Sequence, residues 1–240
     1  MGFDNTYDDA RYAAAYATLD FHRTYHLAYR DLPGILHTHV AGGRALDFGC
    51  GAGRSTRFLR ALGYDVIGAD ISAAMIAKAR ELDPAGDYRL VRDDDHGPLG
   101  EGFDLVFSGF TFDNIPTRER KVALFGHLRD RLSRDGCIVS LVSSPDIYLH
   151  EWASFSTRDF PENRHARSGD VVRIVITDIP DSRPVEDIVW TAQSYREVHA
   201  ASGLEAVAKY APLARGDEPY EWVSETTIAP WNIYVLKRPE

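Results

Sequence analysis

The stretch RALDFGCGAGRSTRFL (residues 44–59) decides the fold of this chain. An apolar run leads to Asp47, and Gly49, Gly51 and Gly53 follow at alternate positions before a helical pattern begins. Glycine lets a backbone turn tightly and lets a ligand come close with no Cβ in the way. Ligands of open parallel sheets bind beyond the carboxyl ends of the strands, so the sequence predicts a strand, a ligand-binding loop and a helix in succession.

Strands and helices alternate on both sides of this first unit. The runs DVIGA, DLVF and CIVSLV are continuously apolar, which is typical of strands buried on both faces. Helical stretches between such strands place helices on both faces of a parallel sheet. We predict strands over 44–48, 64–70, 88–93, 103–110 and 137–144, and helices over 55–63, 72–83 and 118–136.

The pattern changes after Pro145, where an aromatic, polar and irregular stretch begins. The runs VVRIVIT (171–177) and VEDIVWT (185–191) flank a loop that contains two prolines, which predicts a hairpin with a longer loop. A helix over 194–203 and strands over 204–211 and 231–238 complete the prediction.

Composition limits the partners of the protein. The 240 residues carry a formal net charge of −9, with no block of five or more basic residues, so nucleic acid is a poor candidate partner. Cys50 and Cys137 form no CxxC pair, which suits a reducing compartment. No apolar run approaches the ~20 residues of a membrane span, and no signal peptide is evident. We therefore expect a cytoplasmic monomer or homodimer that neither spans nor binds a membrane.

The glycine loop excludes two common nucleotide motifs. No lysine follows the glycines, as a phosphate-binding GxxxxGK[ST] loop requires. The dinucleotide fingerprint GxGxxG needs glycine at position 54, which holds Arg54. The acid at Asp47 would repel a pyrophosphate and suits a cationic or amine-bearing ligand better.

Four stretches now carry a family resemblance. LDFGCGAG (46–53), VIGADIS (66–72), LVRDDDHGPL (90–99) and FDLVFSGFTFDNIP (103–116) occur in order, each at the end of a predicted strand. The sequence resembles the class I S-adenosylmethionine-dependent methyltransferases. In the third stretch Arg92 replaces the usual glycine, and the order of leucine and proline is altered.

The resemblance implies a Rossmann-like α/β fold with a mostly parallel seven-stranded sheet, helices on both faces and an antiparallel last strand. We expect one methyltransferase domain over 1–240. Its parts are an N-terminal helical cap over 7–41, a cofactor-binding core over 42–144, an inserted lid with a hairpin over 145–192, and a final helix with antiparallel strands over 193–240.

The resemblance also implies the residues that bind the cofactor S-adenosylmethionine, whose product is S-adenosylhomocysteine. The glycine loop would hold the methionyl part, Asp70 both ribose hydroxyls, and Asp93 with the Asp94 backbone the adenine. Met75 packs in the core or against the adenine, and Tyr16 closes over the cofactor. The full set is Tyr16, Asp47, Gly49, Cys50, Gly51, Gly53, Asp70, Ile71, Met75, Asp93, Asp94, Ser108 and Gly109.

Residues for the acceptor come from three regions that should converge above the sheet. His150, in the sequence HEW, is the first candidate for a general base, followed by His22 and His26, which are spaced to share a helix face. We expect no metal, because no third ligand accompanies the two histidines and the consecutive acids of 93–95 are typical of a solvated loop. Candidate substrate-binding residues are Tyr12, Tyr25, Phe110, Asp113, Asn114, Trp152, Tyr220 and Trp222.

The lid, the aromatic residues and the absence of a basic surface favour a small acceptor molecule. We expect methyl transfer to a small aromatic or heterocyclic metabolite, as in natural-product biosynthesis, at an N, O or C atom. Two alternatives stay open: a nicotinamide-dependent oxidoreductase, and a cyclase or ligand-binding protein that keeps the fold without methyl transfer.

Overall fold

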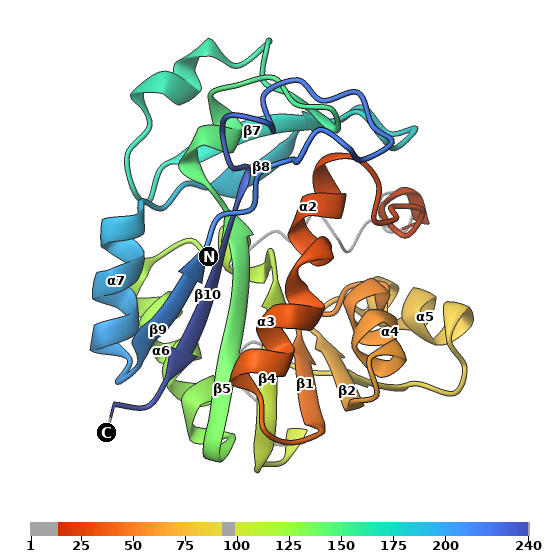
Figure 1. Ribbon diagram of the computed structural model, residues 1–240, viewed down its shortest axis with the longest axis vertical. Helices are drawn as coiled ribbons and strands as arrows, with labels where there is room; N and C mark the ends of the chain where they lie inside the picture. Colours follow the sequence, from red (N-terminus) through yellow and green to blue (C-terminus); the bar gives the residue numbers. More distant parts are fainter. Residues whose placement is uncertain (1–13, 93–98, 240) are drawn as a thin grey trace.

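A seven-stranded sheet forms the centre of the protein (Figure 1). The computed structural model describes residues 14–92 and 99–239. Within them the strand order is β3-β2-β1-β4-β5-β10-β9. The strands are β1 (Arg44–Phe48), β2 (Asp65–Asp70), β3 (Asp87–Leu90), β4 (Phe103–Gly109), β5 (Leu132–Ser143), β9 (Glu205–Tyr210) and β10 (Trp231–Lys237).

The pairing of the strands confirms the predicted fold class. β1 pairs in parallel with β2 on one side and with β4 on the other. β10, the last strand, is antiparallel to both β5 and β9. Strand order reverses between β1 and β4, so the crevice for a ligand lies beyond the carboxyl ends of these two strands.

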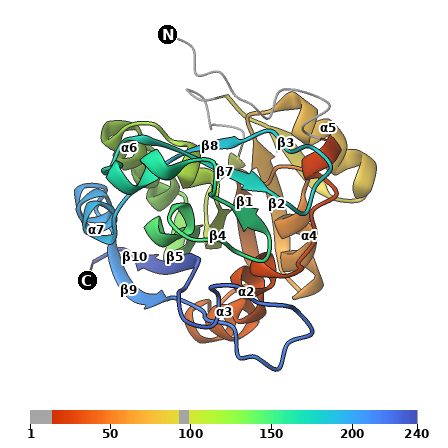
Figure 2. The same ribbon diagram turned by 90° about the horizontal axis from the view of Figure 1, so that it is seen from above.

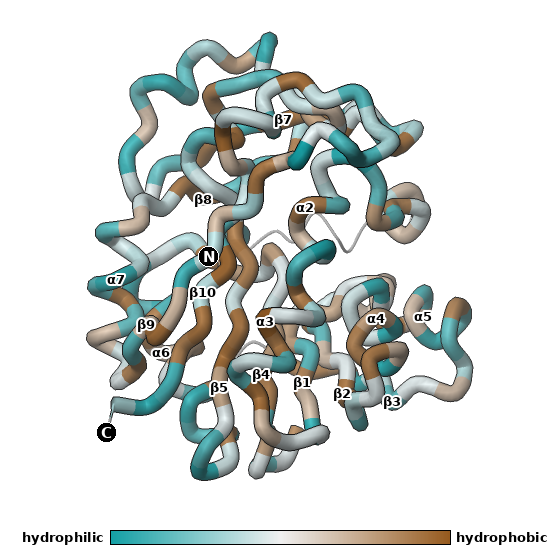
Figure 3. Tube along the Cα trace, in the orientation of Figure 1, coloured by the Kyte–Doolittle hydropathy of each residue, from teal (hydrophilic) through white to brown (hydrophobic). Residues whose placement is uncertain are grey.

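Helices cover both faces of the sheet (Figure 2). Along β1, Ala45 packs toward α2 (Thr24–Arg30), α3 (Leu32–His39) and α4 (Arg54–Ala61), while Leu46 packs toward α6 (Arg118–Asp130) and α7 (Ala192–Ala201). The central strands are hydrophobic along their length, as burial on two faces requires (Figure 3). α5 (Ala73–Leu82) packs beside β2 and β3, and the Ser72 hydroxyl caps it by accepting from the Met75 amide, as the sequence predicts.

The insertion between β5 and α7 forms a lid beyond the carboxyl end of β5 (Figure 1). Its three-stranded sheet has the order β6-β7-β8, with β6 (Phe155–Ser156), β7 (Val171–Ile176) and β8 (Val185–Ile188). β7 and β8 are antiparallel, which confirms the predicted hairpin. The short 3-10 helices η4 (Pro145–Tyr148) and η5 (Pro161–His165) occupy the irregular stretch before it.

Two predicted boundaries are wrong. The helix expected over 118–136 ends at Asp130, and residues from Leu132 onward begin β5. A Cβ at Gly136 would lie 2.5 Å from the Phe103 carbonyl oxygen, so this glycine allows β5 to pack closely on β4 where the pairing shifts register. Within the helical cap expected over 7–41, the described residues form a short helical turn at 14–16, then α2 and α3.

Within the described residues, no helix is both long enough and apolar enough to cross a bilayer.

Candidate active site

The glycine loop is packed tightly from behind and open in front. Gly49, Gly51 and Gly53 have φ values of +74°, +53° and +80°, a region that side-chain-bearing residues rarely adopt. A Cβ at Gly49 would overlap the Thr111 side chain, and a Cβ at Gly53 would lie 2.6 Å from the Tyr88 hydroxyl. A Cβ at Gly51 would meet nothing closer than the Met75 sulfur at 4.0 Å. The space in front of Gly51 is therefore where a ligand can approach.

Asp70, the last residue of β2, fixes the shape of this loop. One carboxylate oxygen accepts from the Gly51 amide at 2.8 Å, and the other accepts from the Ser72 amide at 2.8 Å. Asp70 therefore ties the glycine loop to the start of α5.

Asp47 lies beneath the loop and is fully buried. One of its oxygens accepts from the Ser55 and Thr56 hydroxyls, each at 2.6 Å, in the first turn of α4. Burial raises the pKa of Asp47 to about 6, and these two hydrogen bonds oppose the rise. Asp47 supports the loop from the side of α4 and does not line the pocket in front of it.

A first pocket, here called the loop pocket, opens in front of the glycines with about 430 Å³ of space. Arg54 lines it, with its guanidinium carbon 4.8 Å from the centre of the Tyr25 ring and further contacts to Phe21 and Tyr29. Its side chain also donates to the Asp20 carbonyl at 3.2 Å. Arg54 and Arg57 give the loop pocket cations that suit a ligand carboxylate.

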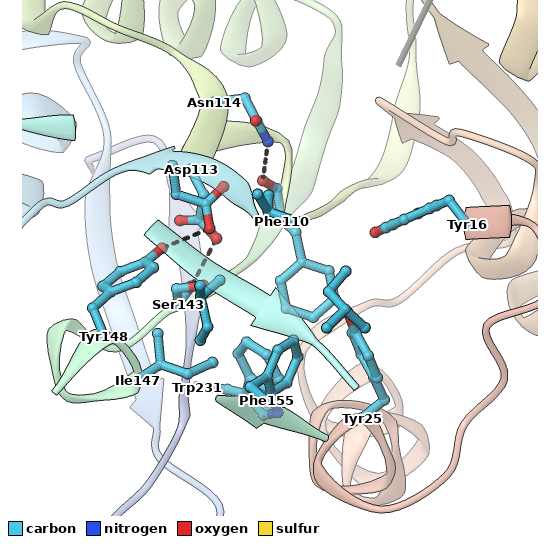
Figure 4. A pocket seen from close by; sticks show the side chains of 14 residues that line it. Tyr16, Tyr25, Phe110, Asp113, Asn114, Ser143, Ile147, Tyr148, Phe155 and Trp231 are labelled. Atoms are coloured by element: carbon cyan, nitrogen blue, oxygen red, sulfur yellow. Dashed lines mark hydrogen bonds between the residues drawn. The ribbon is translucent and has the colours of Figure 1, made fainter. Parts of the chain in front are cut away.

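A second pocket, here called the acceptor pocket, lies under the lid with about 420 Å³ of space (Figure 4). Tyr16 and Phe110 line both pockets, so the two cavities adjoin. Phe110 has a φ of +65°, which is strained for a phenylalanine and fixes its ring at this boundary. The lining of the acceptor pocket is Tyr16, Tyr25, Phe110, Asp113, Asn114, Ser143, Ile147, Tyr148, Phe155, Ile174, Ile176, Val185, Asp187 and Trp231.

Aromatic rings form one wall of the acceptor pocket. Tyr25, Phe110, Phe155 and Trp231 pack on one another with ring centres 4.8–5.9 Å apart. The Trp231 indole donates to the Thr24 carbonyl at 2.8 Å, which ties this wall to α2. The wall is therefore rigid and apolar, as a flat ligand requires.

Two carboxylates form the polar part of the same pocket. Asp113, in η3 (Thr111–Asn114), accepts from the Ser143 amide at 3.0 Å, and Asp187, in β8, accepts from the Tyr148 hydroxyl at 3.0 Å. Burial raises the pKa of both carboxyl groups, and the charge of Asp113 raises that of Asp187 further. Burial also lowers the pKa of Lys121, the buried cation that acts on both.

The comparisons with known proteins agree with this geometry. A family model described as a methyltransferase domain matches residues 46–138, which run from the glycine loop to β5. The chain is 32% identical over 112 residues to malonyl-[acyl-carrier protein] O-methyltransferase of Pectobacterium atrosepticum, a match that covers 46% of this chain and 42% of that protein. Both matches support the resemblance to the class I S-adenosylmethionine-dependent methyltransferases, and the chain spans less than half the length of this curated relative.

Two further proteins resemble a larger part of the chain. Trans-aconitate 2-methyltransferase of Variovorax paradoxus is 23% identical over 201 residues, which cover 78% of this chain and 69% of that protein. The structure is also similar to that of an S-adenosylmethionine-dependent methyltransferase from Clostridium acetobutylicum. That likeness has a TM-score of 0.64 at 13% identity and covers 98% of this chain and 100% of the other. At this identity the structural likeness shows the fold alone.

The fold brings many predicted residues to the two pockets. Gly49, Cys50, Gly51 and Gly109 line the loop pocket, and Tyr25, Asp113 and Asn114 line the acceptor pocket. Of the other predicted cofactor residues, Met75 is buried against Ala52 and Tyr16, Ser108 is fully buried, and Ile71 is exposed beside Asp70. Tyr12, Asp93 and Asp94 lie outside the described residues.

The predicted bases and several aromatic residues do not line either pocket. His22 lies before α2 begins, so it and His26 do not share a face of that helix; both rings instead contact Tyr220, which packs on Trp222. His150 packs against Trp152, whose indole donates to the Ile147 carbonyl in the interior of the lid. Among the described residues, no three potential metal ligands gather in a cluster.

The sequence prediction missed Arg54, Tyr148 and Asp187. Arg54 entered only as a departure from a dinucleotide motif, and Tyr148 was one of many aromatic residues in an irregular stretch. Asp187 carried a usable signal, because it alternates with Val185 on the side of β8 that faces the pocket, while Glu186 faces outward and pairs with Arg173. An acid on the apolar face of a strand indicates a site.

Proposed function

We propose that this protein transfers the methyl group of S-adenosylmethionine to a small aromatic or heterocyclic acceptor bound in the acceptor pocket. The observation that carries the proposal is that the loop pocket and the acceptor pocket adjoin at Tyr16 and Phe110. A methyl donor in one pocket and an acceptor in the other would therefore meet at these two rings.

The residues around the loop pocket fit the cofactor. The open side of Gly51 gives room beside the main chain, the Asp70 carboxylate lies next to Gly51 where ribose hydroxyls would bind, and Arg54 suits the methionyl carboxylate. When bound, the cofactor supplies a methyl group already activated by the positive sulfur. The protein then has to orient the acceptor and exclude water, which together can lower a barrier by roughly 7–11 kcal/mol in the best model systems.

The lid supplies this orientation and exclusion. Ile174, Ile176 and Val185 of the β7–β8 hairpin line the acceptor pocket opposite residues of the core such as Phe110. The Arg23 guanidinium pairs with Asp178 of the lid at 3.0 Å, and the Thr24 amide donates to the Ser154 hydroxyl. These contacts hold the lid against the start of α2, which keeps an apolar cover over the acceptor.

A titration of two variants tests the cofactor half of the proposal. We expect Asp70→Ala to weaken binding of S-adenosylmethionine by about tenfold or more, because charge-assisted hydrogen bonds to the ribose are lost. Asp65→Ala, which removes an exposed acid at the opposite end of β2, should bind the cofactor normally. Equal affinities of both variants in calorimetry would remove Asp70 from the site.

A turnover experiment tests the chemistry. Purified protein with S-adenosylmethionine and a library of aromatic and heterocyclic metabolites should release S-adenosylhomocysteine in the presence of particular acceptors, with a mass gain of one methylene on the acceptor. Tight cofactor binding without transfer to any acceptor would favour a ligand-binding protein instead.

A further inference from the structure

We propose that the acceptor is an amine, which enters the acceptor pocket as an ammonium ion and is held between the carboxylates of Asp113 and Asp187 and the aromatic wall. This inference rests on the proposed function and names the substrate class of the same site.

The first argument for an amine is the negative charge of the acceptor pocket. Both carboxylates line the pocket, Asp113 is only 4% exposed, and among the described residues the pocket lining contains no lysine, arginine or histidine. The buried cation nearby is Lys121, whose ammonium donates to the Phe112 carbonyl and lies 5.0 Å from the Trp190 ring. Lys121 forms an ion pair with neither carboxylate, so neither acid has a paired cation among the described residues. An ammonium ion in the pocket supplies the missing positive charge.

The second argument is the hydrogen-bonding capacity of the two carboxylates. The structure gives Asp113 a donor in the Ser143 amide and gives Asp187 a donor in the Tyr148 hydroxyl. An ionised carboxylate has about four acceptor positions, so both acids retain capacity for the N–H groups of a ligand. Two such acceptors on neighbouring elements, η3 and β8, match the several donors of one ammonium group.

The third argument is the attraction of the aromatic wall for a cation. Figure 4 shows Phe155 and Trp231 across the pocket from Asp113. Faces of tryptophan, tyrosine and phenylalanine attract a cation, and the attraction is stronger where water is excluded. An anionic acceptor, such as the trans-aconitate in the name of one relative, would meet two carboxylates here and no cation among the described lining residues. The pocket therefore selects against acids.

The same pair can receive the proton that an ammonium ion must lose. Burial raises the pKa of both carboxyl groups, which makes them stronger bases than exposed acids. The ammonium gives one proton to the pair, and its freed nitrogen lone pair forms the new C–N bond as the methyl carbon–sulfur bond breaks and sulfur keeps those electrons. The products are a methylated ammonium ion, a neutral thioether and one proton, which passes from the carboxylate to water.

Binding measurements test the substrate class directly. Protein saturated with S-adenosylhomocysteine is titrated with phenethylamine, tyramine and tryptamine, and with the carboxylic acid and the alcohol built on each of the same aryl-ethyl skeletons. We expect binding of the amines and much weaker binding of the alcohols and acids. Parallel reactions with S-adenosylmethionine record which compounds are methylated.

Variants identify the residues. Asp187→Asn and Asp113→Asn should each weaken amine binding by about thirtyfold or more, with unchanged affinity for S-adenosylhomocysteine, which also shows that the variants are folded. Glu186→Gln is the matched control, because its exposed carboxylate pairs with Arg173 on the outer side of the same strand.

The outcomes separate the two proposals. Absence of amine binding, equal binding of acids or alcohols, or full amine affinity in both aspartate variants would overturn the amine assignment. Methylation of an alcohol or an acid but of no amine would also overturn it, while leaving methyl transfer in place. Selective amine binding without any methylation would support the recognition site and contradict methyl transfer.

Discussion

At the scale of single residues, Asp47 combines complete burial with a function in the fold. Its carboxylate anchors the first turn of α4 through Ser55 and Thr56, yet its charge lies away from water. Its pKa rises from 3.8 to about 6, so the folded state binds this proton more tightly than the unfolded chain does. The protonated Asp47 carboxyl therefore contributes its full stabilisation of the folded state below about pH 4, and this contribution is lost as the pH rises through 6.

The Asp47→Asn variant tests this linkage. Asparagine stays neutral and can still accept from the two hydroxyls, so the unfolding free energy of the variant relative to wild type should rise by about 2 kcal/mol between pH 4 and pH 7. Urea unfolding at both pH values measures the change, with Asp65→Asn, an exposed acid of β2, as the control. A difference that does not vary with pH would show that burial does not perturb Asp47.

Sequence patterns predicted the residues of the glycine loop but only some of the residues that line the acceptor pocket. The glycines at 49, 51 and 53 and the acid at 70 are separated by one crossover helix, so their spacing brings them together at the carboxyl ends of the neighbouring strands β1 and β2. The acceptor pocket joins α2, η3, η4 and the lid, and nothing local indicates which side chains meet there. His150 and Trp152 were predicted as site residues because of their residue types. The irregular stretch instead packs their side chains within the lid.

At the scale of elements, periodicity predicted the alternating strands and helices better than their ends. Burial on two faces makes the strands of the core continuously apolar, and this signal is strong. The boundary between α6 and β5 was predicted wrongly because residues 133–136 are polar or glycine and follow the helical pattern without a break. Their strand conformation depends on close packing against Phe103 of β4, a tertiary contact.

Glu225 connects three elements and provides a prediction at this scale. Its buried carboxylate accepts from the Thr24 hydroxyl of α2 at 2.6 Å, from the Ala153 amide of the lid at 2.8 Å and from the Val223 amide at 2.9 Å. Glu225→Ala leaves these buried donors without an acceptor and should destabilise the protein by about 3 kcal/mol or more.

Denaturant unfolding monitored by circular dichroism measures this loss. Glu221→Ala, an exposed acid in the same loop, serves as the control and should change stability by less than about 0.5 kcal/mol. Similar small effects of both substitutions would mean that the lid is held to α2 by other contacts, such as the Arg23–Asp178 ion pair.

At the scale of the whole molecule, both pockets lie at the carboxyl edge of the sheet. The lid lies beyond the same edge (Figure 1). A ligand that binds the folded chain and not the unfolded chain stabilises the whole protein by mass action. S-adenosylhomocysteine at 100 times its dissociation constant should therefore add about 2.7 kcal/mol to the free energy of unfolding.

Alanine substitutions at two glycines distinguish an effect on cofactor binding from ordinary backbone strain. Gly51 and Gly63 both have positive φ values, and an added Cβ has open space at each, with only the Met75 sulfur at 4.0 Å from that of Gly51. Replacing either by alanine should destabilise the unliganded protein by about 1–3 kcal/mol through strain. Only Gly51→Ala places its methyl group in the loop pocket, so thermal unfolding should show a reduced response to S-adenosylhomocysteine in that variant and a full response in Gly63→Ala. Equal responses would mean that the cofactor does not press against this glycine, and the loop pocket would then belong to another ligand.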